Sequence, residues 1–251
     1  MHTVAAEAMI YWKDPVSGSW TDASKWSTGT VPGPSDHAYI TTPGNYTVTI
    51  NSNITVGAVT LGGDNEQQTL AIAGGALILN NNSMVSPHGN LLFSNGYLAG
   101  TGILSVNGSM IWSGGTMYDT GTTAIEPGAV LTISGTASKA MRLGRLLTNA
   151  GTIQVTGTGN VTLEHTATTI DNLAGGTLDF QVDAAFRYVS STSLLGTVRN
   201  EGTLKKTGGA GQAWIGVPFN NTGQVDVQKG ELALTAGGTS TGPFTAAVGA
   251  R

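Results

Sequence analysis

Short segments in which apolar and polar residues alternate run along the whole chain, and glycine or asparagine separates them. Alternation with a period of two is typical of a β-strand that turns one face to a core. In the second half of the chain, four segments share a phrase: apolar, any residue, Asn, a short spacer, Gly, Thr or Gln, apolar. They are residues 147–155, 170–180, 198–206 and 219–227. Their glycines recur at intervals of 21 to 26 residues, the range of one turn of a β-solenoid.

Stacked turns of this kind would place like residues over like. One inward column would hold Leu147, Ile170, Val198 and Phe219, and a second would hold Ile153, Leu178, Leu204 and Val225. Between these columns a ladder of asparagines would mark a corner, because asparagine tolerates left-handed backbone angles and can hydrogen-bond its neighbour in the next turn. The predicted ladder consists of Asn149, Asn172, Asn200 and Asn221.

Other positions fit the repeat less closely. Lys206 falls in the slot that apolar residues hold in the other three segments, so either that turn bulges or the register there is off by one. A second strand is predicted about twelve residues after each repeat glycine, where Leu163, Tyr188 and Trp214 align. Upstream, similar short β-rich segments bounded by Gly or Asn recur with looser spacing, at residues 75–80, 102–107 and 128–133.

The repeat predicts an all-β fold, a single-stranded right-handed parallel β-helix (β-solenoid) of about ten turns. A solenoid must cover its open ends. Three of the five tryptophans, Trp12, Trp20 and Trp26, lie near the start of the chain among several prolines, which predicts an N-terminal cap with a tryptophan core. We therefore expect one continuous domain, with the cap and first strands in residues 1–50 and the repeats in residues 51–251.

Composition agrees with this architecture and excludes several classes of protein. Only 10% of the residues are charged and 37 of the 251 are glycine, which is incompatible with a helical bundle. Eleven Lys and Arg against fifteen Asp and Glu, for a net charge of −4, argue against nucleic-acid binding. Cysteine is absent, so disulfides and thiolate metal sites are excluded.

Two further expectations concern membranes and the ends of the chain. No apolar run reaches the roughly 20 residues that span a bilayer. Met1–Ala8 is too short and too polar for a complete signal peptide, and residues 247–251 contain no evident capping element. These ends suggest a piece of a longer protein.

The N-terminal region carries a family resemblance. Residues 20–40, followed by Tyr46–Ile50 and Val59–Gly63, resemble the opening of many bacterial extracellular repeat proteins and, more distantly, the eight-glycine domain of extracellular carbohydrate-processing proteins. The repeats that follow are similar to those of autotransporter and haemagglutinin-type adhesins. The resemblance implies a secreted or surface-displayed β-solenoid and transfers no catalytic site.

Motifs of the common enzyme classes are absent from the sequence: there is no nucleophile elbow, zinc helix, phosphate loop or dinucleotide fingerprint. The four histidines lie far apart, and none has a second ligand at metal spacing. We therefore expect neither a metal site nor a cofactor.

One charged stripe allows two interpretations. The outward position three residues after each repeat glycine holds Gln154, Asp179, Lys205 and Asp226. β-Solenoid polysaccharide lyases and glycoside hydrolases build their sites on such a face, so Asp179, Asp183 and Lys205 are the candidate catalytic residues if the protein is an enzyme. The alternative, which we favour, is a solvated face whose alternating charges support adjacent turns.

Aromatic side chains allow a similar pair of interpretations. Exposed rings could stack on sugars, with Arg187 nearby, or the same rings could fill the core. The candidate ligand-binding residues are Trp112, Tyr118, Arg187, Tyr188 and Trp214. For Tyr188 and Trp214 the alignment with Leu163 favours burial, and for Trp112 the sequence does not decide.

These observations together predict a noncatalytic structural or adhesive module in the extracellular space or on a cell surface. Its expected partners are polysaccharide or other copies of itself, with end-to-end association through the last turn. The alternatives are a carbohydrate-active enzyme and a self-assembling filament or surface-layer subunit.

Overall fold

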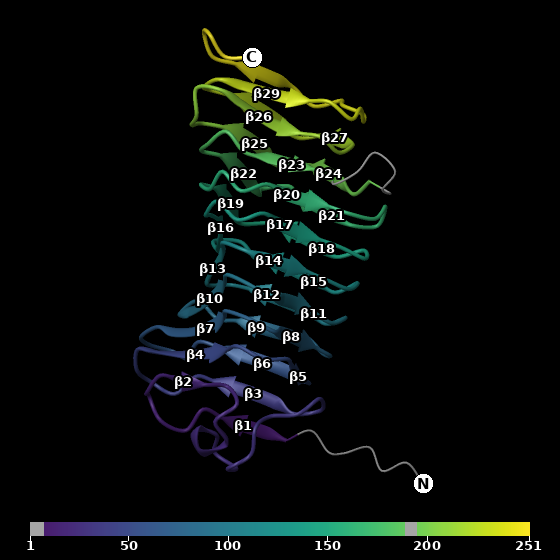
Figure 1. The fold of residues 1–251 in the computed structure, drawn as a ribbon. Helices are drawn as coiled ribbons and strands as arrows, with labels where there is room; N and C mark the ends of the chain where they lie inside the picture. Colours follow the sequence, from purple (N-terminus) through teal and green to yellow (C-terminus); the bar gives the residue numbers. More distant parts are fainter. Residues whose placement is uncertain (1–7, 189–194) are drawn as a thin grey trace.

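The chain winds into a rod of stacked turns (Figure 1). The computed structural model describes residues 8–188 and 195–251. Each full turn contributes one strand to each of three parallel sheets, which we call sheets I, II and III, and in the described residues these contain ten, eleven and nine strands. The prediction of an all-β parallel β-solenoid is therefore confirmed, with about nine turns.

Sheets I, II and III contain the strands in the order of the chain. Sheet I holds β1 (Met9–Tyr11), β3 (His37–Ile40), β6 (Ala58–Leu61), β9 (Ser83–Val85), β12 (Ile103–Val106), β15 (Thr122–Ile125), β18 (Leu146–Asn149), β21 (Thr169–Asn172), β24 (Thr197–Asn200) and β27 (Phe219–Asn221). Sheet II holds β2 (Gly18–Ser19), β4 (Tyr46–Ile50), β7 (Gln68–Ile72), β10 (Gly89–Phe93), β13 (Ser109–Trp112), β16 (Val130–Ile133), β19 (Thr152–Val155), β22 (Thr177–Phe180), β25 (Thr203–Lys206), β28 (Gln224–Val227) and β30 (Phe244–Ala246). Sheet III holds β5 (Ile54–Val56), β8 (Ala76–Leu79), β11 (Tyr97–Ala99), β14 (Gly115–Met117), β17 (Lys139–Met141), β20 (Val161–Leu163), β23 (Ala185–Arg187), β26 (Gln212–Ile215) and β29 (Glu231–Leu234). A 3-10 helix, η1 (Ala23–Lys25), interrupts the first turn.

The predicted columns of the second half are confirmed residue by residue. In sheet I, Leu147 lies opposite Ile170, which lies opposite Val198 and then Phe219. In sheet II, Ile153, Leu178, Leu204 and Val225 form the second column. Every member of both columns is buried. Full burial of each such side chain stabilises the fold by roughly 1.5–3 kcal/mol.

The asparagine ladder is also confirmed. The side-chain Nδ2 of Asn149 donates to Oδ1 of Asn172, Asn172 donates to Asn200, and Asn200 donates to Asn221, each at 2.7 Å. All of these side chains are buried at the corner between sheets I and II. In the preceding turn Ile125 occupies the same column, so Oδ1 of Asn149 faces a neighbour that has no donor and remains without a hydrogen bond.

Lys206 takes an apolar position of the repeat, and the two explanations given above for it, a bulge and a register shift, are both wrong. The strand neither bulges nor slips, because Lys206 pairs in regular register with Phe180 on one side and Val227 on the other. The side chain points inward and is fully buried. Its ammonium stays buried and reaches the following corner, where Nζ lies 2.8 Å from Oδ1 of Asp183 and donates to the carbonyl of Gly208 at 2.6 Å.

The segments 75–80, 102–107 and 128–133 contain the strands β8, β12 and β16, which belong to three different sheets. The alignment of Trp214 with Leu163 and Tyr188 is wrong, because Trp214 is opposite Ala185, and it is Ile215 that follows Phe186 in the inward column of sheet III. The error arises because the corners between sheets vary in length.

The first turn contains a cluster of tryptophans. Trp12, Trp20 and Trp26 are all buried, with ring centroids 5.1 Å apart for Trp12 and Trp26 and 4.9 Å apart for Trp20 and Trp26. Indole Nε1 of Trp26 donates to the carbonyl of Trp20 at 2.8 Å. The parallel ladder runs through residue 50 without interruption, since β4 pairs with both β2 and β7. That the tryptophan cluster serves as a cap stays a prediction.

Within residues 8–188 and 195–251, no helix is both long and apolar enough to cross a bilayer.

Candidate functional site

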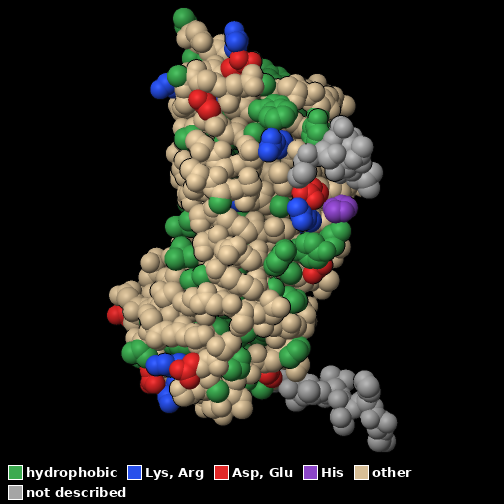
Figure 2. All heavy atoms as spheres, in the orientation of Figure 1, with side chains coloured by type: hydrophobic (Ala, Val, Ile, Leu, Met, Phe, Trp, Pro, Cys, Tyr) green, Lys and Arg blue, Asp and Glu red, His purple; other side chains and the backbone are tan. Residues whose placement is uncertain are grey.

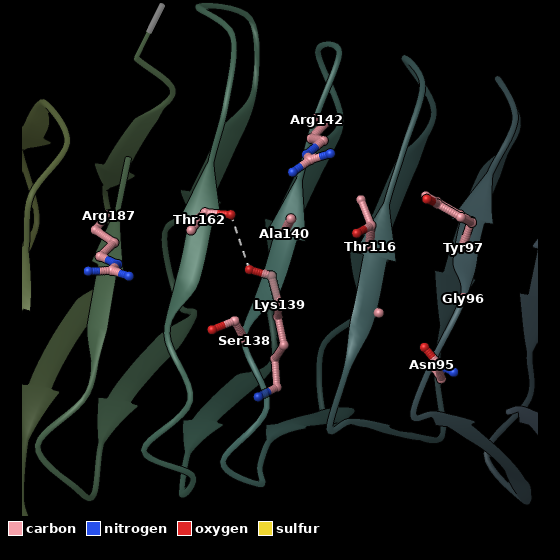
Figure 3. Close-up of a pocket in the computed structure, with 11 residues that line it drawn as sticks. Asn95, Gly96, Tyr97, Thr116, Ser138, Lys139, Ala140, Arg142, Thr162 and Arg187 are labelled. Carbon is pink, nitrogen blue, oxygen red and sulfur yellow. Dashed lines mark hydrogen bonds between the residues drawn. The ribbon is translucent and has the colours of Figure 1, made fainter. Parts of the chain in front are cut away.

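An open groove runs along the outer face of sheet III. The strands β11, β14, β17, β20 and β23 form its floor, and its volume is about 460 Å³. An outward row crosses these five strands in register: Tyr97, Thr116, Ala140, Thr162 and Arg187 (Figure 3). Small residues in the middle of the row leave the hollow, and the large side chains of Tyr97 and Arg187 stand at its two ends. The groove therefore follows the axis of the solenoid.

Cations line the groove and no carboxylate lines it. Lys139, Arg142 and Arg187 are among the lining residues, although the chain as a whole has a net charge of −4. Nε of Arg142 lies 2.9 Å from a carboxylate oxygen of Glu164. Nε of Arg187 is buried and has no hydrogen-bond partner in the described structure. Among the described residues, Arg187 therefore has no carboxylate partner, in contrast to Arg142.

Lys139 lies with its side chain beneath the groove, in the inward column of sheet III that also holds Val161 and Phe186. Its side chain is almost completely buried and Nζ donates to the carbonyl of Ala137 at 2.9 Å. Burial away from water lowers the pKa of this ammonium. Thr162 closes the floor beside it by donating from its hydroxyl to the Lys139 carbonyl at 3.2 Å (Figure 3).

Tyr97 forms the other end of the groove, and Tyr118 packs beside it. Tyr97 is 47% exposed, and the ring of Tyr118 lies edge-on to it with centroids 6.1 Å apart. A partly exposed ring held by a second ring offers a flat apolar face to a ligand at little cost in conformational entropy. The face of the molecule in Figure 2 otherwise carries few charged side chains, and these gather in small groups.

Of the predicted ligand-binding residues, four lie on or next to sheet III and one does not. Trp112 is fully buried in sheet II, where its ring stacks on Phe93 with centroids 6.2 Å apart. It packs in the core and has no face to offer a sugar, so its place among the ligand-binding residues is wrong. Arg187 lines the groove.

Tyr118, Tyr188 and Trp214 are half-buried. Tyr118 borders the groove through Tyr97. Tyr188 follows directly after β23 and packs partly against the core. Trp214 alternates along β26 with the fully buried Ala213 and Ile215, so it faces outward and is not the core residue that its alignment favoured.

The predicted charged stripe forms on sheet II, away from the groove. Gln154, Asp179, Lys205 and Asp226 pair in register across adjacent strands. Asp179 accepts hydrogen bonds from the hydroxyl of Thr207 at 2.8 Å and from the amide of Gln181 at 3.1 Å. The stripe is thus an outer face whose carboxylates already have side-chain donors.

Asp183 does not join that stripe. It lies at the corner after β22, where it accepts from Lys206 and from the backbone N–H of Gly211 at 2.9 Å. The hydrogen bond from Lys206, more than any other contact, lowers the pKa of this carboxyl. A general acid needs the opposite shift. The structure therefore does not bring Asp179, Asp183 and Lys205 together as one catalytic group.

Tyr97 and Arg142 are groove residues that the sequence interpretation missed. Their signal lies in the corner glycines, because Gly96 and Gly115 both have positive φ, and each precedes or begins a strand of sheet III. Aligning the upstream turns on these glycines would have placed Tyr97 opposite Thr116. Within the described residues, no group of three or more metal-ligating side chains lies close enough together to hold an ion.

The comparisons with known proteins give no relative: no protein-family model, curated protein or solved structure matches the chain. The likeness to bacterial adhesins and to the eight-glycine domain therefore stays a prediction.

Proposed function

We propose that the chain is a noncatalytic module of a secreted or cell-surface bacterial protein, and that it contacts polysaccharide through the outer face of sheet III. The observation that carries the proposal is the groove itself, in which the exposed ring of Tyr97 and the charge of Arg187 stand at opposite ends of a row of small residues. Flat apolar rings and directional donors are the groups that recognise sugars.

The enzyme alternative has less support. Its three candidate residues divide between an outer face and a corner, and the Asp183 carboxylate balances the buried charge of Lys206. The groove contains no pair of carboxylates that could serve as acid and base.

A glycan array run beside a reducing-sugar and unsaturated-product assay tests the proposal. We expect binding to at least one polysaccharide and no cleavage of it. Asp179→Ala with Lys205→Ala should leave the binding profile unchanged. Cleavage that disappears in this double variant would establish the enzyme instead, and the absence of binding to every glycan would refute the adhesive role.

Association with a second copy is a further candidate, favoured by the last turn. Beneath β30 lies an apolar hollow of about 300 Å³ lined by Val225, Val227 and Leu232, and Phe244 beside it is 51% exposed. Edge strands with apolar side chains invite pairing with another chain. Light scattering across a concentration series should show dimers that Phe244→Glu abolishes, whereas a monomer at all concentrations would contradict this candidate.

A further inference from the structure

Two arginines, Arg142 and Arg187, bring positive charge to the groove on sheet III, and no Asp or Glu is among its lining residues. Lys139 also lines the groove, but its side chain is almost completely buried. Glu164 lies at the edge of the groove, where it pairs with Arg142 and accepts from the hydroxyl of Thr162 at 3.4 Å, so the charge of Arg142 is already compensated. A ligand in the groove therefore meets uncompensated positive charge at Arg187.

Arg187 has the features of an anion-binding side chain. Its side chain is half-buried and Nε, although buried, has no acceptor in the described residues. The rest of the guanidinium is only half-buried and is open to a ligand in the groove. The planar guanidinium presents its N–H groups as a fork that matches the two oxygens of a carboxylate.

The dimensions of the groove indicate an extended chain. Tyr97 and Arg187 lie in the same outward row, four strands apart. At about 4.8 Å per turn, their backbones are separated by roughly 19 Å, which is longer than one sugar ring. The hollow between them is floored by Thr116, Ala140 and Thr162, so a polymer can lie flat along it.

We infer that this groove binds an acidic polysaccharide of the uronic-acid class, lying parallel to the solenoid axis. The ring of Tyr97 would stack on one sugar, and Arg187 would bind the carboxylate of another. The inference rests on the proposed function and adds the chemistry of the ligand.

Polygalacturonate and its fully methyl-esterified form provide matched probes, because they share a backbone and differ in charge. We expect the intact chain to bind the acid form at least about tenfold more tightly by calorimetry, the weight of one charge-assisted hydrogen bond. Binding of the acid form should weaken as salt is added.

Two groove variants and one control variant test whether Arg187 and Tyr97 contact the polymer. Arg187→Gln should weaken binding of polygalacturonate by about tenfold, and Tyr97→Ala should weaken both polymers. Arg199→Gln is the control, since Arg199 is an exposed arginine on sheet I outside the groove, and it should change binding by less than about twofold. Thermal melting checks that each variant folds, and Arg187→Lys replaces Arg187→Gln if that variant does not.

Several results would overturn the inference. Equal binding of both polymers, or an unchanged affinity in Arg187→Gln, would leave the proposed function standing and remove the selection for acid. Equal binding of single-stranded DNA would show a general anion site. No binding of polygalacturonate with binding of neutral glycans refutes only the inference, whereas no binding of any glycan refutes the proposed function as well.

Discussion

The asparagine ladder shows how one residue type can fix the register of a whole stack. Each interior asparagine accepts from the turn before and donates to the turn after, and Asn172 also donates to the carbonyl of Thr203 at 3.2 Å. A slip of one residue would replace these bonds with buried unpaired amides. The ladder therefore specifies register more strongly than an apolar column of similar volume.

Removing an interior rung should cost more than removing the first one. Asn172→Ala leaves Oδ1 of Asn200 without a donor in a buried corner, so we expect a loss of about 2–4 kcal/mol in unfolding free energy. Asn149→Ala also removes an oxygen that already lacks a partner, and should cost about half as much. Urea denaturation measures both, and equal losses would contradict the ladder as the source of the stability.

A second residue-scale device is the buried lysine. Lys206 lies between Phe180 and Val227 in an otherwise apolar column, and Asp183 at the corner compensates its charge. Removing only the carboxylate leaves the buried ammonium without a counter-charge, whereas removing both charges leaves an apolar column.

Asp183→Asn should therefore destabilise the chain at pH 7 by about 1–3 kcal/mol, a range reduced because the carboxylate is about a third exposed. Adding Lys206→Met should restore stability to within about 1 kcal/mol of the original. A double variant no more stable than Asp183→Asn alone would contradict this account.

The same pair gives a pH dependence. Because the pKa of Asp183 is lowered in the folded state, its contribution is complete above the unfolded value of about 3.9 and is lost as the pH falls through the folded value. Urea midpoints at pH 7 and pH 3 should differ less for Asp183→Asn than for the unmodified chain.

At the scale of elements, the corners decide where each strand begins. Gly96 has φ of +81°, and a Cβ there would lie 2.1 Å from the carbonyl oxygen of Gly75 in the turn below. Gly128 has a similar φ of +86° but nothing within 4 Å of its added Cβ. Substitution at Gly128 therefore tests backbone strain alone, whereas substitution at Gly96 tests strain together with close packing between turns.

Gly128→Ala should cost about 1 kcal/mol, the price of a left-handed conformation in an L-residue. Gly96→Ala adds a collision with the backbone, and we expect a loss of at least about 2–3 kcal/mol. Denaturant unfolding of the two variants compares them directly. A Gly96 variant no less stable than the Gly128 variant would show that adjacent turns are not in contact at this corner.

The corners also explain how far the sequence predicts this molecule. Sheets I and II were predictable in the second half because a short corner with Asn and Gly joins them, so Leu147 and Ile153 keep a nearly constant spacing from turn to turn. The strands of sheet III follow corners of varying length. For that reason Trp214 was aligned with the wrong partner, and the groove residue Tyr97 was overlooked.

At the scale of the whole molecule, the stability of the solenoid is approximately the sum of the contributions of its turns and of the contacts between neighbouring turns. About nine turns at roughly 4.8 Å each make a rod of about 43 Å. Such a rod can present a long row of outward side chains with few specified residues, because each turn needs to contribute only one residue to the row. The groove on sheet III is one use of that geometry.

The axial stacking of turns can be measured directly in a chain without cysteine. Thr49, Thr132 and Asp226 occupy one outward row of sheet II, with four turns between the first two and four between the last two. Spin labels on cysteines at these positions report pairwise distances by electron-spin resonance. The account predicts about 19 Å for Thr49 to Thr132 and for Thr132 to Asp226, and about 38 Å for Thr49 to Asp226. A longest distance well short of the sum of the other two would contradict a straight stack in register.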